Sequence, residues 1–313
     1  MVGHIDPALA PLVAALPPTD IRQPAAARAR LAALRAARPP FVVPPDLTKA
    51  WLEVPSDAGS PAIRVLTMRP ARPAASAIPA IVYLHGGGFV MGDAEGDQLL
   101  TSQLAQATGG LVLSVDYRLA PEHRFPAGHD DGYRVLAWLV GRAGDLGVDP
   151  DRIAVAGSSA GAGLAAGIAL RARDHAGPRL AAQLLEIPAL DDRAETPSAR
   201  YEDTPMWNRG NVLDSWAHYL GGRPASGYAA PARAEDLSAL PPTYVGVCAT
   251  DPLRDEGIAY AQRLAHHGTP TELRMYAGLF HGAASTFPDV AACRRARAAL
   301  LDAAARLLAP RSP

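Results

Sequence analysis

The chain has 313 residues, of which 49% are hydrophobic and 19% are charged, a balance that can build a sizeable core and excludes an intrinsically disordered protein. Its 30 basic and 31 acidic residues leave a formal charge of −1, so no strong field would draw it to nucleic acid or to an anionic membrane. Two cysteines, Cys248 and Cys293, are too few for a disulfide framework, and we expect a reduced, cytoplasmic setting.

The apolar runs of the chain are short. The longest, residues 160–170, is about half of the ~20 residues that a membrane-spanning helix needs. The apolar stretch at 8–16 follows Asp6 and is preceded by no lysine or arginine, whereas a secretory signal begins with positive charge. We therefore expect neither a membrane span nor an export signal.

The first 45 residues form a separate region in the sequence. Residues 25–37 have a helical pattern, and prolines at 17, 18, 24, 39 and 40 bound it on both sides. This pattern predicts a helical arm over 1–45.

From about residue 62, apolar runs of four to seven residues alternate with longer helical stretches. The predicted strands are 63–68, 80–84, 111–115, 153–156, 182–187, 243–247 and 272–276, and the predicted helices are 96–108, 129–141, 160–174, 255–266 and 289–308. Such alternation is typical of βαβ units and predicts an α/β fold with a mostly parallel sheet.

Residues 188–230 interrupt this alternation. They show no core strand pattern, yet they carry large apolar side chains in a polar background: Met206, Trp207, Val212, Leu213, Trp216, Tyr219 and Leu220. We predict a helical insertion that covers a substrate site. A surface helix held down by its aromatic residues is the alternative.

A serine between glycines stands where a predicted strand meets a predicted helix. The segment Gly157-Ser158-Ser159-Ala160-Gly161 places Ser159 on a sharp turn, and its two glycines leave room for the strand and the helix to pass. The N-terminus of a helix carries partial positive charge from the helix dipole, and this charge stabilises the anion that forms when a nearby hydroxyl takes part in acyl transfer. Ser159 is therefore the candidate nucleophile, and an ordinary glycine-rich turn is the alternative if the motif stands alone.

Three consecutive glycines follow the predicted strand at 80–84. In His85-Gly86-Gly87-Gly88 no side chain shields the backbone N–H groups of the glycines, so these groups can converge on an oxygen that carries developing negative charge. A phosphate-binding loop is the competing interpretation, but neither G-x-x-x-x-G-K-[ST] nor G-x-G-x-x-G followed by an acidic strand end occurs. The segment therefore predicts an oxyanion hole.

A nucleophilic serine needs a base, and the base needs an acceptor that fixes its tautomer. Asp251 follows the predicted strand at 243–247, and His281 follows the one at 272–276. Because functional groups of open α/β sheets gather beyond the carboxyl ends of the strands, Asp251 and His281 are the candidate pair. Asp255 is the rival acid, although its position favours a role at the start of the following helix.

The chain resembles the hormone-sensitive-lipase-like carboxylesterases of the α/β-hydrolase superfamily. The resemblance spans residues 62–308. It rests on HGGGF at 85–89, DYRLAPEHRFPA at 116–127, GSSAG at 157–161, DPLRDEG at 251–257 and FHG at 280–282. The sequence departs from the family at Ser158, because many members have aspartate or threonine before the nucleophile.

The resemblance implies an α/β-hydrolase fold, in which helices flank a mostly parallel central sheet and a helical cap covers the site. It implies that Ser159 is the nucleophile, His281 the general base and acid, and Asp251 the partner that orients His281. It also assigns the backbone N–H groups of three residues to the oxyanion hole: Gly87, Gly88 and Ala160.

The same resemblance implies the division of the chain. The arm at 1–45 and the insertion at 188–230 would build the cap, over a catalytic domain formed by 46–187 and 231–313. The segment 116–127 would support the loop at 85–88, which is called the glycine loop below. We expect the substrate pocket to be walled by Phe89, Val90, Met206, Trp207, Leu213 and Leu279.

These features together predict a serine carboxylesterase that hydrolyses short- to medium-chain carboxylic esters through an acyl-enzyme intermediate. The implied partner is a small apolar ester, no metal or organic cofactor is implied, and a homodimer is left open. A serine hydrolase of amides, lactones or carbamates would share the triad and differ in pocket shape. A non-catalytic ligand-binding receptor of this fold would lack a triad member, whereas all three are present here.

Overall fold

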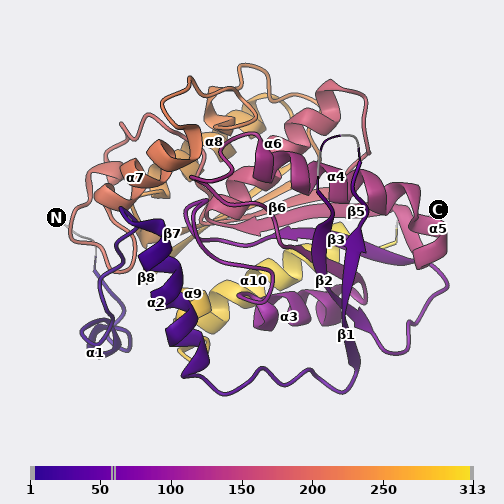
Figure 1. Cartoon of the computed structure of the whole chain (residues 1–313), viewed down its shortest axis with the longest axis horizontal. Helices are drawn as coiled ribbons and strands as arrows, with labels where there is room; N and C mark the ends of the chain where they lie inside the picture. The colour runs from indigo at the N-terminus through magenta and orange to yellow at the C-terminus, as the bar shows by residue number, and fades with distance from the viewer. Residues whose placement is uncertain (1–3, 58, 60, 311–313) are drawn as a thin grey trace.

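A sheet of eight strands forms the centre of the molecule (Figure 1). It is seen in a computed structural model that describes residues 4–57, 59 and 61–310. The spatial order is β1-β2-β4-β3-β5-β6-β7-β8, in which β2 is antiparallel to β1 and β4 and the other pairs are parallel. The strands are β1 (Leu47–Val54), β2 (Ile63–Pro70), β3 (Ile78–Leu84), β4 (Leu111–Val115), β5 (Val148–Ser158), β6 (Ala182–Glu186), β7 (Thr243–Thr250) and β8 (Thr271–Phe280).

The predicted α/β fold is confirmed, and each predicted strand lies in this sheet. The strand that the sequence did not predict is β1. It pairs only with β2 at the edge of the sheet, and most of its side chains are exposed or half-buried. An edge strand of this kind needs no continuous apolar run, so it leaves a weak pattern in the sequence.

Helices cover both faces of the sheet: α3 and α10 lie along one face, and α4, α6 and α8 along the other (Figure 1). The side chains of β3 alternate between the two faces of the sheet. Ala80 and Val82 pack with the layer of α4 and α6, whereas Ile81 and Tyr83 pack with α3 and α10. The helices are α1 (Ala10–Val13), α2 (Pro24–Ala36), α3 (Gln98–Thr108), α4 (Ala127–Gly141), α5 (Ala143–Leu146), α6 (Ala160–Asp174), α7 (Arg209–Leu220), α8 (Arg254–His266), α9 (Ala283–Thr286) and α10 (Ala291–Leu307). Within the described residues, none of these helices combines the length and the apolar character that crossing a bilayer requires.

The segment 188–230 carries one helix of more than three residues, α7, as the density of aromatic residues suggested. The side chains of Val212, Trp216 and Tyr219 are buried in the core shared with α4 and α6, so this helix is firmly attached to the molecule. Its assignment to a cap, together with 1–45, stays a prediction.

Arg28 of α2 is one of the residues that attach the N-terminal arm to the rest of the molecule. The Arg28 guanidinium donates to the carbonyl oxygens of Val90, at 2.7 Å, and Ala120, at 2.8 Å. It also makes two contacts with the Glu122 carboxylate, at 2.7 and 3.0 Å. Through one side chain, α2 therefore holds the segment after the glycine loop and the 116–127 segment in place.

We expect Arg28→Ala to lower the free energy of unfolding by about 2–3 kcal/mol, because it removes charge-assisted hydrogen bonds to partly buried carbonyl oxygens. Urea unfolding followed by tryptophan fluorescence measures this change. The control is Arg22→Ala, since Arg22 is exposed and pairs with Asp20, two residues away. Equal unfolding midpoints for the two variants would contradict the role of Arg28.

Candidate active site

The turn between β5 and α6 holds Ser159 in a strained backbone conformation. Its φ is 56° and its ψ is −119°, and its N–H donates to the Glu186 carbonyl oxygen at 2.8 Å. The flanking glycines are required by close packing. A Cβ on Gly157 would lie 2.4 Å from the carbonyl carbon of Gly161, and a Cβ on Gly161 would lie 2.0 Å from the Leu84 carbonyl oxygen.

Three side chains from distant parts of the chain meet at this turn. The Ser159 hydroxyl lies 2.9 Å from Nε2 of His281, and Nδ1 of His281 lies 2.8 Å from Oδ2 of Asp251. A carboxylate only accepts hydrogen bonds, so Nδ1 carries the hydrogen and donates it to Asp251, which leaves Nε2 free to accept from Ser159. The arrangement is that of a nucleophile, its base and the group that orients the base.

The ends of β7 and β8 deliver the acid and the base. Asp251 directly follows β7, and its Oδ1 accepts from the N–H of Leu253 at 2.8 Å, which fixes the carboxylate. His281 directly follows β8. Both side chains are buried, at 1% and 6% exposed, so their interaction is weakly screened by solvent.

Asp255, the rival acid, faces another part of the molecule. Its carboxylate accepts from the N–H of Ser198 at 2.8 Å and from Arg254 at 2.7 Å. These contacts place it in the second position of α8, where it ties the helix to the 188–230 segment. Asp251 is the acid that reaches His281.

The glycine loop lies beside Ser159 in a conformation that glycine favours. The φ angles of Gly87 and Gly88 are 131° and 59°, and no hydrogen bond within the described residues takes up the N–H of either. A Cβ on Gly87 would lie 2.0 Å from the Met91 carbonyl oxygen, and one on Gly88 would lie 2.4 Å from the Trp207 ring. The loop therefore keeps bare backbone beside the nucleophile.

The 116–127 segment supports this loop through Tyr117. The Tyr117 hydroxyl donates to the carbonyl oxygen of His85 at 2.7 Å, and the two rings stack with centroids 4.2 Å apart. Burial lowers the pKa of His85, so its ring stays neutral at pH 7 and its place in the stack carries no charge. His85 thus holds the loop and lies outside the proton relay.

A cavity of about 200 Å³ opens in front of Ser159 and His281. Separate parts of the chain build its walls, among them the glycine loop, the arm, the 188–230 segment and α9. Besides the triad members Ser159 and His281, the lining includes Thr19, Leu31, Arg35, Gly86, Gly87, Gly88, Met91, Asp97, Met206, Trp207, Ser285 and Thr286.

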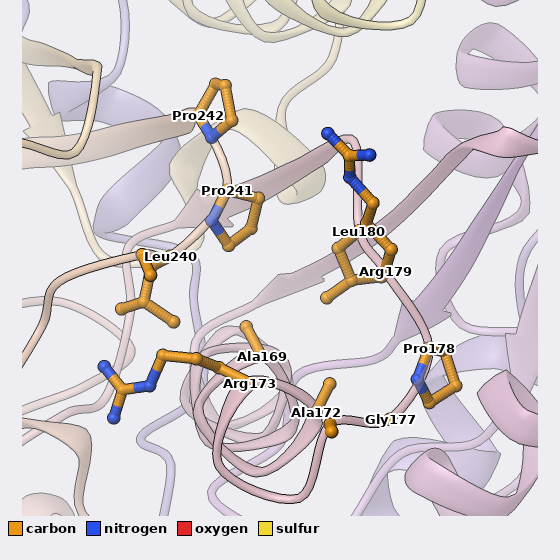
Figure 2. A pocket seen from close by; sticks show the side chains of 12 residues that line it. Ala169, Ala172, Arg173, Gly177, Pro178, Arg179, Leu180, Leu240, Pro241 and Pro242 are labelled. Atoms are coloured by element: carbon orange, nitrogen blue, oxygen red, sulfur yellow. The ribbon is translucent and has the colours of Figure 1, made fainter.

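A larger cavity, of about 360 Å³, lies elsewhere, between the C-terminal end of α6 and residues 239–242 (Figure 2). Its walls are mainly alanine, leucine and proline, with Arg173 and Arg179 as the charged residues. The Arg173 guanidinium is already occupied by the carbonyl oxygens of Asp236 and Ser238. This cavity offers no nucleophile or base, so the smaller one is the candidate active site.

Two of the six expected wall residues line this cavity, and the other four lie elsewhere. Met206 and Trp207 line the cavity, and the Trp207 ring lies 5.7 Å from the His281 ring. The Phe89 ring instead stacks on Tyr219 with centroids 4.0 Å apart. Val90 and Leu279 are fully buried in core clusters, and Leu213 is 42% exposed. For these last four residues the role of pocket wall stays a prediction, which their positions do not favour.

Several residues of the cavity were not predicted from the sequence. Leu31 and Arg35 reach it from α2, and Thr19 reaches it from the segment before that helix. Arg35 also forms an ion pair with Asp93. The pattern at 25–37 predicted the helix. It contains no local feature that shows which of its residues would lie beside the glycine loop, about fifty residues later in the chain.

Comparisons with known proteins agree with this geometry. A family model described as alpha/beta hydrolase fold matches residues 81–285. The chain is 39% identical over 247 residues to Esterase LipI of Mycobacterium tuberculosis (strain ATCC 25618 / H37Rv), a match covering 77% of this chain and 76% of the relative. It is 41% identical over 213 residues to Carboxylesterase NlhH of the same strain, a match covering 66% of each. It is also similar to a solved structure described as Bacterial Heroin Esterase, with a TM-score of 0.91, 40% identity and 98% of both chains covered.

Proposed function

This chain belongs to the hormone-sensitive-lipase-like family of α/β hydrolases, as a carboxylesterase, and we propose that it hydrolyses short- to medium-chain carboxylic esters through an acyl-enzyme at Ser159. The observation that carries the proposal is the unbroken relay from Ser159 through His281 to Asp251 at the floor of the cavity.

In the first half of the reaction, His281 takes the proton of Ser159 as its hydroxyl oxygen attacks the ester carbonyl carbon. The carbonyl oxygen becomes an anion, and the N–H groups of Gly87, Gly88 and Ala160 donate to it. Each such donor contributes roughly 10²- to 10³-fold to turnover in enzymes of this chemistry. His281 then gives its proton to the alkoxide, so the alcohol leaves neutral and the acyl group stays on Ser159.

In the second half, water enters the space left by the alcohol. His281 takes a proton from this water as its oxygen attacks the acyl carbon, and the same N–H groups receive the second anion. Return of that proton to the Ser159 oxygen releases the carboxylic acid. Asp251 stabilises the imidazolium in both halves and stays ionised.

The walls of the cavity support a cap made from the arm and the 188–230 segment. Leu31 and Arg35 come from the arm, and Trp207 comes from the insertion, so both would close over a bound ester. Closure excludes water and strengthens the electrostatic interactions inside the site.

The size of the cavity supports small substrates. Its volume of about 200 Å³ lies below the roughly 300–1,000 Å³ of pockets that hold drug-sized ligands. We therefore expect acyl chains of about four to six carbons to fill it, and much longer chains to leave part of their apolar surface in water.

The test is a profile of kcat/KM over p-nitrophenyl esters from two to sixteen carbons. We expect a maximum at about four to six carbons and a fall of about 10²-fold or more by twelve, because the longer chains do not fit the cavity. The p-nitroanilide of the preferred acyl group is assayed beside the ester, to test the alternative that the protein acts on amides. A maximum at sixteen carbons, or an anilide cleaved as fast as the ester, would contradict the proposal.

A further inference from the structure

The first part of β8, residues 271–277, is an open edge of the sheet. β8 pairs with β7 on one side. On its other side the described residues pair with it only near its end, where the N–H of Asp6 donates to the Gly278 carbonyl oxygen at 2.9 Å. Leu273 and Met275 lie on the open part and are 37% and 59% exposed. An exposed edge strand with apolar side chains can pair with a strand of another chain.

The hydrogen bonds to β7 show which backbone groups of β8 are free. The N–H of Thr243 donates to the carbonyl oxygen of Pro270 at 2.8 Å, so the even-numbered residues of this part of the chain direct their backbone groups toward β7. The N–H and C=O groups of Thr271, Leu273 and Met275 therefore point away from the sheet. No backbone hydrogen bond within the described residues takes them up.

The sequence of this edge favours one register for pairing with a second copy. Two antiparallel strands exchange hydrogen bonds between residues that point outward, and a twofold axis at Leu273 meets this condition. Glu272 of each copy then lies opposite Arg274 of the other. An axis at Glu272 or at Arg274 would place like charges directly opposite, which destabilises a strand pair. An axis at Met275 would place Arg274 opposite Tyr276, without an acid.

The side chains of Glu272 and Arg274 are within reach of a neighbouring strand. They lie on one face of β8, where Nε of Arg274 contacts Oε1 of Glu272 at 2.7 Å and Arg306 of α10 pairs with the same carboxylate. The Arg274 side chain is 58% exposed, so it can contact a second acid. Leu273 and Met275 lie on the opposite face, where the strand of a second copy would cover them.

We propose that two copies of this chain associate through β8, antiparallel and centred on Leu273, so that their sheets become continuous. Backbone hydrogen bonds join Leu273 to its own copy and Thr271 to Met275, and the two pairs of Glu272 with Arg274 set the register. Because the same edge serves both copies, the interface is used up in a dimer. This inference is independent of the proposed function.

The first test is charge reversal, read as the dissociation constant of the dimer in analytical ultracentrifugation. We expect the wild type to be dimeric at about 10 µM. Arg274→Glu should raise the dissociation constant about tenfold or more, because it places two acids opposite each other on both sides of the axis. The double variant Glu272→Arg/Arg274→Glu exchanges the charges, so it should recover most of this loss.

Arg142→Glu is the matched control for the charge reversal. The Arg142 side chain is also 58% exposed and pairs with a nearby acid, Asp145, at 2.8 Å. It lies between α4 and α5, away from β8. This variant should leave the dissociation constant of the dimer unchanged.

A cysteine cross-link tests the register with the charges in place. Opposite residues of a hydrogen-bonded antiparallel pair have Cα atoms about 5.5 Å apart, a distance that a disulfide spans. Under mild oxidation, Leu273→Cys should therefore give a covalent dimer on a non-reducing gel. Met275→Cys is the control, since this position is more exposed, yet the register holds its two copies four residues apart, about 13 Å. The native Cys248 and Cys293 are buried.

Three results would overturn the proposal. One is a wild type that sediments as a monomer up to about 100 µM. Another is a dimer whose dissociation constant Arg274→Glu leaves unchanged. The third is Met275→Cys cross-linking as fast as Leu273→Cys, which contradicts the register. Circular dichroism checks that each variant is folded, and the cross-link decides the question if Arg274→Glu is not.

Discussion

Replacing Ser159 with alanine is expected to lower kcat for ester hydrolysis by about 10⁶-fold, the loss seen when a serine triad is deprived of its nucleophile. The Ser159 oxygen forms the bond to the acyl group, and its hydrogen bond to Nε2 of His281 at 2.9 Å is the path for the proton. Without this oxygen no acyl-enzyme forms, and the residual rate comes from water attacking an ester held by the oxyanion donors. Initial rates on the preferred p-nitrophenyl ester measure the loss.

The matched control for this substitution is Ser102→Ala. Ser102 is buried in α3, and its hydroxyl donates to the carbonyl oxygen of Leu99 at 2.9 Å. This variant should keep the wild-type rate. An organophosphate should add one adduct to the wild type and to Ser102→Ala, and none to Ser159→Ala, as intact mass reports. Undiminished hydrolysis by Ser159→Ala would remove the triad from the mechanism.

Asp251→Asn is expected to lower kcat by about 10⁴-fold while the fold stays intact, as the corresponding substitution does in other serine triads. The carboxylate at 2.8 Å from Nδ1 of His281 holds the hydrogen on that nitrogen. An asparagine amide can turn its own hydrogen toward Nδ1, which moves the imidazole hydrogen to Nε2. In that tautomer Nε2 faces Ser159 as a donor and cannot take its proton.

Asp255→Asn separates this effect from the loss of a nearby carboxylate. Asp255 lies four residues later and holds the N–H of Ser198, so its removal should change kcat by less than about tenfold. Stopped-flow or steady-state kcat values for the two variants at pH 8 give the comparison. A larger loss for Asp255→Asn than for Asp251→Asn would reverse the assignment of the acid.

The triad could be predicted from the sequence because its members stand at the ends of strands. Ser159, Asp251 and His281 each follow a strand that has a clear apolar pattern, and parallel strands bring their carboxyl ends to one edge of the sheet. The spacing along the chain, more than a hundred residues between serine and histidine, is irrelevant once the strands are placed. Local sequence therefore carried most of the information about the reacting groups.

The walls of the pocket could not be predicted in the same way. Phe89 directly follows the glycine loop, yet its backbone has a φ of 64°, and its ring stacks on Tyr219 in the core instead of facing the cavity. Leu31 reaches the cavity from α2, which Arg28 attaches to the carbonyl oxygen of Val90, just after the glycine loop. Such contacts depend on how distant elements pack, and no period or motif within one segment encodes them.

The cavity joins a reacting centre encoded after residue 84 to walls that include Thr19, Leu31 and Arg35. The reacting groups and part of the cavity wall therefore come from different stretches of the polypeptide. We expect exchange of the first 45 residues between related chains to change the part of the cavity wall formed by Thr19, Leu31 and Arg35, while the three residues of the triad stay as they are.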